Sequence, residues 1–208
     1  MNIIFDLDGT LIDASNRLYY LFQKLVPQST LTKAEYWNRK RNKIGHEQIL
    51  REEFPELSFE YFNSKWMNLI ETDEYLEMDC CYTDTIDTLK ILNQKCSIFL
   101  LTARQNKEKL LNELRRLSLL PYFKKIFVTQ NRKSKDELLK EILESKEIRF
   151  SNEDLFVSDM GRDIEIGNKY GFYTIAITHG FMSKEKLQEY NPKCCMDKLF
   201  ELINYITM

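Results

Sequence analysis

Two patterns of hydrophobic positions divide the chain. In residues 14–79 apolar side chains recur three and four positions apart, as in Leu18, Leu21, Phe22 and Leu25, which is typical of amphipathic helices. Elsewhere, short apolar runs end in polar or charged residues and alternate with helical stretches. Such short runs are typical of buried strands. The chain therefore consists of a helical segment set into a segment in which strands and helices alternate.

The alternating part predicts a parallel, doubly wound sheet with right-handed crossovers, an α/β fold. Strands are expected at residues 3–5, 97–101, 125–128, 155–157 and 173–177, with a short edge strand at 194–196. Helices are expected at residues 85–93, 105–117, 135–144, 163–170 and 199–206. In this architecture ligands bind at the carboxyl ends of the strands.

Residues 14–79 are expected to form an inserted α-helical cap, and residues 1–13 and 80–208 the α/β core. Breakers at Pro27, Gly45 and Pro55 indicate about four helices. The insertion also carries a basic cluster, which either draws an anionic substrate or forms an ordinary solvated helix face. Its members are Lys33, Arg39, Lys40, Arg41 and Lys43.

Composition excludes several classes of function. A net charge of -2 gives no global attraction to nucleic acid or to an anionic membrane. No apolar run approaches the ~20 residues that span a bilayer, and no charged leader precedes the first strand, so we expect a cytoplasmic protein. The cysteines lack zinc spacing and are expected to be reduced and mostly buried. They are Cys80, Cys81, Cys96, Cys194 and Cys195.

Two aspartates follow the first strand. In extended backbone, alternate side chains point to the same face, so Asp6 and Asp8 are aimed into one small volume. Such a pair repels itself, which predicts a metal site, an acid/base pair or both. The alternative is an N-cap and turn, since Asp, Gly and Thr all favour turns. A calcium loop is excluded, because Gly9 stands at its fourth position and Arg17 at its twelfth.

Further polar residues follow the other predicted strands. Thr102 follows the second strand, Lys133 and Lys135 the third, and Asp159 and Asp163 the fourth. Parallel strands bring these positions to the same edge of the sheet as the first aspartate pair. A carboxylate nucleophile, an acid/base, a divalent metal and donors for phosphate oxygens are what phosphoryl transfer requires.

With these motifs the chain resembles the haloacid dehalogenase-like (HAD) superfamily. Within it, the chain is similar to the phosphoglycolate-phosphatase-like branch, which has a helical cap. The first motif is residues 6–13, Asp-Leu-Asp-Gly-Thr-Leu-Ile-Asp. The second is residues 100–104, the third a lysine near Lys135, and the fourth residues 157–165. Residues 171–187 also resemble that branch. The resemblance implies a Rossmann-like core and spans nearly the whole chain.

By this resemblance, Asp6 is the nucleophile that becomes an aspartyl phosphate. Asp8 protonates the leaving oxygen and then deprotonates the hydrolytic water. Mg²⁺ would be held by the Asp6 carboxylate, the backbone carbonyl of Asp8 and the Asp159 carboxylate, which fits its preference for few protein carboxylates and several waters. Thr10 and Asp163 would support these ligands.

The same resemblance assigns phosphate binding to Thr102, to the backbone N–H of Ala103 and to Lys135. Lys133 competes with Lys135, although the apolar face of the following helix favours Lys135. Taken alone, Thr102 is equally an N-cap and either lysine a surface residue. Arg104 is expected to face solvent, with contact to a substrate anion as the alternative.

The chain departs from the family pattern at Ser158 and Met160, which are expected to tighten the fourth-motif loop without removing a ligand. His46 and His179 are expected to be loop histidines without a catalytic role. The expected function is a magnesium-dependent phosphatase acting on a small phosphorylated metabolite, with no nucleic-acid or membrane partner. A phosphomutase of the same fold and a non-catalytic binding module remain alternatives. A dehalogenase does not fit, because that branch lacks the second aspartate.

Overall fold

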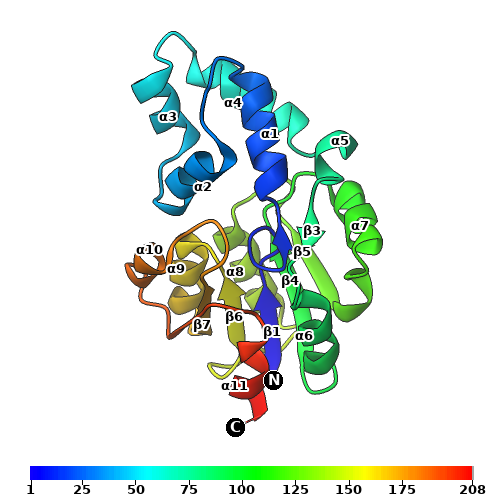
Figure 1. Cartoon of the computed structure of the whole chain (residues 1–208). Coiled ribbons are helices and arrows are strands. Elements are labelled where there is room, and N and C mark those ends of the chain that lie inside the picture. Colours follow the sequence, from blue (N-terminus) through cyan, green and yellow to red (C-terminus); the bar gives the residue numbers. More distant parts are fainter. Residues whose placement is uncertain (208) are drawn as a thin grey trace.

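The computed structural model describes residues 1–207, in which a six-stranded parallel sheet forms the centre (Figure 1). The strand order is β5-β4-β1-β6-β7-β8, and every pairing is parallel. The strands are β1 (Asn2–Phe5), β4 (Ser97–Thr102), β5 (Lys125–Val128), β6 (Leu155–Ser158), β7 (Tyr173–Ile177) and β8 (Cys194–Met196). The predicted parallel α/β sheet, including its edge strand, is confirmed.

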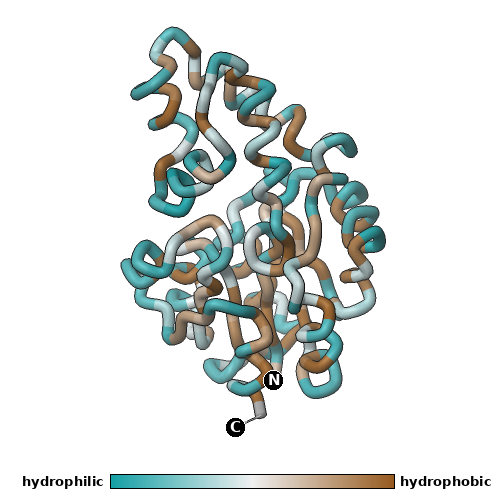
Figure 2. The backbone as a smooth tube through the Cα atoms, viewed as in Figure 1, coloured by the Kyte–Doolittle hydropathy of each residue, from teal (hydrophilic) through white to brown (hydrophobic). Residues whose placement is uncertain are grey.

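Helices cover both faces of this sheet because side chains along each strand alternate between faces. Ile3 and Phe5 pack in one hydrophobic cluster with residues of α6, α7 and α11, whereas Ile4 packs in a second cluster with residues of α8 and α9. These helices are α6 (Thr85–Leu92), α7 (Lys107–Arg116), α8 (Lys135–Ser145), α9 (Gly161–Lys169) and α11 (Glu201–Thr207). Figure 2 shows the apolar strands enclosed between more polar helices.

A second group of helices, α1–α5, lies above the carboxyl edge of the sheet in Figure 1 and has a hydrophobic cluster of its own. Leu21, Phe22, Tyr36 and Ile49 are fully buried in it. Five helices form here rather than about four. They are α1 (Ser15–Leu25), α2 (Lys33–Arg41), α3 (His46–Glu53), α4 (Phe59–Leu69) and α5 (Asp73–Leu76). We call them the helical group.

The chain enters and leaves the helical group through a two-stranded antiparallel ribbon. Its strands are β2 (Ile12–Asp13) and β3 (Cys80–Cys81), with Ile12 opposite Cys81 and Asp13 opposite Cys80. Pairing of the two connections holds the helical group next to the motif loop that follows β1.

The cysteines correct one expectation. All five are free thiols, but only Cys96 is buried, whereas Cys80 is exposed and the others are intermediate. The reason is that four of them lie in β3 and β8, short strands at the margin of the fold. Within residues 1–207, no helix has both the length and the apolar character needed to cross a membrane.

Candidate active site

Asp6 lies at the carboxyl end of the central strand β1, 5% exposed, where a lysine from α8 reaches it. The Lys135 ammonium donates to Asp6 Oδ1 at 2.6 Å and to Asp163 Oδ2 at 2.6 Å. Asp6 Oδ2 accepts no hydrogen bond from any residue between 1 and 207. One carboxylate oxygen of Asp6 is thus anchored, and the other is available for chemistry.

The start of α8 explains why Lys135 and not Lys133 occupies this position. Ser134 is the N-cap, its hydroxyl accepts from Glu137 N–H, and the Glu137 carboxylate accepts from Ser134 N–H, a capping box. The box fixes Lys135 as the first helical residue, beneath Asp6. Lys133 instead forms an ion pair with Glu141 on the surface of α8.

Asp159 is fully buried after β6 and held by both carboxylate oxygens. The Thr10 hydroxyl donates to Oδ1 at 2.8 Å, and the Phe181 N–H donates to Oδ2 at 2.6 Å. Gly9, at a φ of +82°, passes so close that a Cβ there would lie 2.1 Å from Asp159 Oδ2. Gly180 is as tight, with 2.2 Å to the same oxygen. Only glycine lets these two loops close over the carboxylate.

Ser158, one of the departures from the family pattern, supports the fourth-motif loop. Its hydroxyl donates to Asp163 Oδ2 at 2.8 Å and accepts from Met160 N–H at 3.1 Å. Asp163 is therefore oriented by both Ser158 and Lys135. The Ser158 hydroxyl thus adds two hydrogen bonds within the loop, and the loop keeps its acidic residues.

The carboxylates of Asp6 and Asp159 are buried close to each other, which disfavours their charged forms. Burial raises the pKa of Asp6 to about 7, against the opposing charge of Lys135. Burial and the neighbouring charge of Asp6 raise the pKa of Asp159 well above its usual range. Two buried carboxylates that repel each other suit a divalent cation, which removes the repulsion. Among residues 1–207 no three His, Cys, Asp or Glu side chains form a metal cage. Carboxylate oxygens are hard donors of the kind that Mg²⁺ prefers, and this ion binds few protein carboxylates and retains several waters.

Asp8 is bound by two arginines, and this corrects the expectation that Arg104 faces solvent. Arg104 is only 4% exposed. Its Nε donates to Asp8 Oδ2 at 2.7 Å and its Nη2 to Asp8 Oδ1 at 2.8 Å, while Arg17 Nη2 also donates to Oδ1. Burial works to raise the pKa of Asp8, but the charges of Arg104 and Arg17 outweigh it and lower the pKa to about 2.

Two further acids lie behind these arginines. Asp79 accepts from Arg17 Nε at 3.1 Å and from Arg104 Nη2 at 3.2 Å. Glu113 lies 3.0 Å from the same Arg104 nitrogen. Burial, together with the charge of Asp8 and the proximity of Glu113, raises the pKa of Asp79 to about 8 despite the opposing charge of Arg17. Asp79 therefore takes up a proton more readily than an exposed aspartate does.

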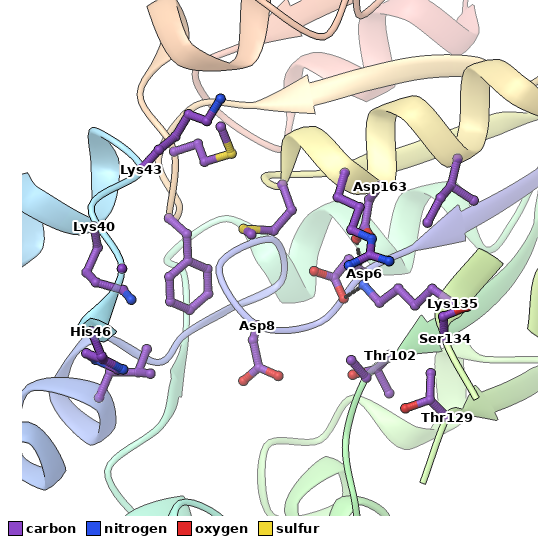
Figure 3. Close-up of a pocket in the computed structure, with 18 of the residues that line it drawn as sticks. Asp6, Asp8, Lys40, Lys43, His46, Thr102, Thr129, Ser134, Lys135 and Asp163 are labelled. Atoms are coloured by element: carbon purple, nitrogen blue, oxygen red, sulfur yellow. Dashed lines mark hydrogen bonds and ion pairs between the residues drawn. The ribbon is translucent and has the colours of Figure 1, made fainter. Parts of the chain in front are cut away.

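A cavity of about 790 Å³ separates the helical group from the carboxyl edge of the sheet. Asp6, Asp8, Thr102 and Ala103 line it from the sheet side. The Thr102 hydroxyl makes no hydrogen bond to the residues that the structure describes. Thr102 as a residue is 1% exposed. Figure 3 shows Asp6 and Thr102 on one side of the cavity, with Lys40 and His46 on the other.

The basic cluster of α2 separates into bound members and one free cation. Arg41 donates to Gly180 O at 2.7 Å and to Thr178 O at 2.9 Å, which ties α2 to the loop after β7. Lys33 donates to Asn16, Arg39 pairs with Glu53, and Lys43 pairs with Glu189. The Lys40 ammonium has no hydrogen-bond or ion-pair partner within residues 1–207, and the residue lines the cavity. Lys40, half-buried at the cavity wall, is the member of the cluster placed to meet an anion there.

The two histidines differ from each other. His46 is the first residue of α3 rather than a loop residue, and it lines the cavity among aromatic rings, with Trp66 at 4.2 Å between centroids. Its Nε2 shares a hydrogen bond of 2.8 Å with the Tyr36 hydroxyl. His179 lies in a turn, with its ring tilted against that of Tyr82 at 3.8 Å between centroids.

Sequence reasoning missed Arg17, Asp79, Glu113 and the cavity position of Lys40. Arg17 precedes the apolar stripe of α1, and nothing in its local pattern separates it from a surface arginine. The only available signal was charge in an otherwise apolar context, since buried arginines and acids are rare unless paired.

Comparisons with known proteins identify a family whose model matches most of the chain. Residues 3–177 match the family model described as haloacid dehalogenase-like hydrolase. A haloacid dehalogenase-like hydrolase from Streptococcus pneumoniae superposes with a TM-score of 0.80 at 19% identity, covering 99% of this chain and 97% of that one. No curated protein matches the chain.

Two other solved structures add detail. One, described as a predicted phosphoglycolate phosphatase from Haemophilus somnus, has a TM-score of 0.78 at 18% identity and covers 100% of this chain and 97% of its own. The other, a HAD-hydrolase from Bacillus subtilis bound to magnesium, has a TM-score of 0.68 at 23% identity, covering 100% and 98%. At these identities the likeness establishes a shared fold.

The raised pKa of Asp79 predicts how stability depends on pH. A carboxyl whose folded-state pKa is raised gives stability that is complete below its unfolded pKa and is lost as pH rises through the folded value, here about 8. The free energy of unfolding in urea should therefore fall between about pH 5 and about pH 9. Asp79→Asn should reduce this fall, leaving the part due to Asp6 and Asp159. An unchanged pH dependence in the variant would contradict the assignment.

Proposed function

Because the chain belongs to the haloacid dehalogenase-like hydrolase family, we propose that it is a magnesium-dependent phosphatase that hydrolyses a small phosphomonoester through an aspartyl phosphate on Asp6. The observation that carries the proposal is the hydrogen bonding of the Asp6 carboxylate at the wall of the cavity. Lys135 anchors its Oδ1, and its Oδ2 has no partner within residues 1–207. An oriented carboxylate with one available oxygen is suited to in-line attack on phosphorus.

The groups around Asp6 fit the charge that develops on the transferred phosphoryl group. Lys135 supplies a buried positive charge, and the unpaired Thr102 hydroxyl supplies a donor from the end of β4. The N–H of Ala103, at the exposed start of the next loop, adds a backbone donor. Donors fixed before the reaction stabilise equatorial oxygens without reorganisation.

Asp8 is proposed as the acid and base of the reaction. With a pKa of about 2 it is an anion in the free chain, which suits removal of a proton from the hydrolytic water. For the first step, the negative charge of the bound phosphate beside Asp8 raises its proton affinity, because like charges disfavour the ionised form. Asp8 then takes up a proton from solvent and passes it to the leaving oxygen.

Magnesium would be held by the carboxylates of Asp6 and Asp159 and the backbone carbonyl of Asp8. When bound, the ion offsets the repulsion between an anionic nucleophile and an anionic phosphate. The chain prepares this set by fixing both oxygens of Asp159 through Thr10 and Phe181 N–H and by holding Asp163 on Lys135.

Residues 14–79 are proposed to act as a cap that selects the substrate. The unpaired Lys40 faces the cavity from α2, opposite the phosphate-binding end. An unpaired, half-buried cation favours an anionic partner. We therefore propose a substrate with a second anionic group beyond the phosphate, in the manner of phosphoglycolate.

The nucleophile is tested by Asp6→Asn with a generic aryl phosphate and Mg²⁺. Turnover should fall by about 1,000-fold or more, because the amide cannot form the phosphoryl intermediate. Asp73→Asn is a matched control, since the Asp73 side chain is 83% exposed in α5, and it should leave turnover unchanged. Activity that survives Asp6→Asn would remove Asp6 from this role.

Magnesium binding should compete with protons on the buried carboxylates. Because burial raises the pKa of Asp6 to about 7, Mg²⁺ affinity should rise from about pH 6 to about pH 8. Calorimetry in two buffers of different ionisation enthalpy should detect proton release on binding. Affinity that is independent of pH, without proton release, would argue against this metal site.

The substrate class is tested by Lys40→Met. The kcat/KM for phosphoglycolate should fall by about tenfold or more, because the second anion loses a charged partner. The kcat/KM for an aryl phosphate without that anion should change little. Lys65→Met, in the same helical group but exposed, is the control. An equal loss with both esters would contradict the selection of a second anion.

A further inference from the structure

Three hydrogen bonds fix the Asp8 carboxylate unequally. Oδ1 accepts from both Arg17 Nη2 and Arg104 Nη2, whereas Oδ2 accepts only from Arg104 Nε. Each carboxylate oxygen offers about two lone-pair sites. Oδ1 is therefore saturated, and Oδ2 keeps one free site. The Asp8 side chain is 22% exposed toward the cavity, so the free site is accessible to a bound ligand.

The two arginines come from different parts of the fold. Arg104 follows β4 of the sheet, whereas Arg17 belongs to α1 of the helical group. Arg17 Nε also binds Asp79, which lies after α5 and directly before β3, and Arg17 Nη1 donates to Ile70 O at 3.3 Å. The entrance and the exit of the helical group thus both contribute to the contacts on Asp8.

The network around Asp8 is a buried set of ion pairs. Arg17 pairs with Asp8 and Asp79, and Arg104 pairs with Asp8, Asp79 and Glu113. Each of the four side chains around Asp8 is at most 4% exposed: Arg17, Arg104, Asp79 and Glu113. Removing one partner from a buried ion pair leaves an uncompensated charge, so each contact on Asp8 is costly to break. Bidentate arginine contacts add a fixed orientation to the attraction.

We propose that Arg17 and Arg104 are positioning residues that present Oδ2 of Asp8 as the oxygen that carries the proton. Because Arg17 belongs to α1, this alignment depends on the helical group being packed next to the sheet. The inference rests on the proposed acid/base role of Asp8. It goes beyond that role by naming the reacting oxygen and the two side chains that aim it. The arginines act through Asp8 and do not bind the phosphate.

The proposal predicts a selective loss that depends on the leaving group. An alkyl ester needs its leaving oxygen protonated, whereas a nitrophenyl ester departs as a stable anion. In Arg104→Gln and Arg17→Gln the kcat/KM for an alkyl phosphate should fall on the order of 100-fold, because a misplaced acid loses about this much. The kcat/KM for nitrophenyl phosphate, which reports the steps through leaving-group departure, should change little. Asp8→Asn should show the same selectivity and serves as the reference.

Arg116→Gln is the matched control. Arg116 donates to Leu76 O at 2.8 Å and to Asp79 O at 3.1 Å, so it binds the same connection without touching Asp8. It should not alter the ratio of the two kcat/KM values. Arg104→Lys keeps the charge but cannot bind both oxygens, and it should show a partial selective loss. This variant also keeps the test valid if Arg104→Gln does not fold, as judged by circular dichroism.

A parallel loss with both esters would overturn the proposal, since it would mean structural damage or phosphate binding by the arginines. Orthovanadate binding, measured by calorimetry with Mg²⁺, gives a readout without turnover. Its affinity should fall in the Arg17 and Arg104 variants and not in Arg116→Gln; equal affinities would also overturn the proposal. If wild type hydrolyses neither ester, the phosphatase proposal fails, and the positioning role that rests on it fails too. If the variants turn over both esters without leaving-group selectivity, the phosphatase proposal stands and the positioning role fails.

Discussion

Repulsion among buried carboxylates at one edge of the sheet is the constraint on which this structure depends. Asp6, Asp8, Asp159 and Asp163 all follow strands that end at that edge, and none is more than partly exposed. Burying unpaired carboxylates is costly, so each must be neutralised, hydrogen-bonded or protonated. The fold meets this requirement with cations and donors brought from elements far away in the sequence.

The four carboxylates have different partners, and these partners give them different chemical properties. Lys135 from α8 binds Asp6 and Asp163 but leaves one Asp6 oxygen without a partner in residues 1–207. Thr10 and Phe181 N–H hold Asp159 with neutral donors that lower its pKa, but burial and the charge of Asp6 outweigh them and keep the pKa raised. A cation that removes this repulsion can therefore still bind Asp159. Two arginines hold Asp8 as an anion. The helical group contributes one of these arginines, which links its position to the site.

Local patterns predicted the sheet and the polar positions at its carboxyl edge, because apolar runs and their polar ends are encoded within a few residues. Lys135 could be favoured over Lys133 because Leu138 and Leu139 set the face of the following helix. The burial of Arg104 could not be predicted, since it follows from pairing with Asp8, 96 positions away. Arg17 and Asp79 are 62 positions apart and likewise carry no local signal of their contact. The number of helices in residues 14–79 was underestimated because α5 is too short to show a period.

The most direct test of this account is chemical trapping of Asp6 during turnover. Wild type turning over an aryl phosphate with Mg²⁺ would be quenched in acid, reduced with borohydride and digested for peptide mass spectrometry. The account predicts that residue 6 alone is converted to homoserine, the product of a reduced aspartyl phosphate. Continued turnover with residue 6 unmodified, or with the modification at residue 8, would contradict it.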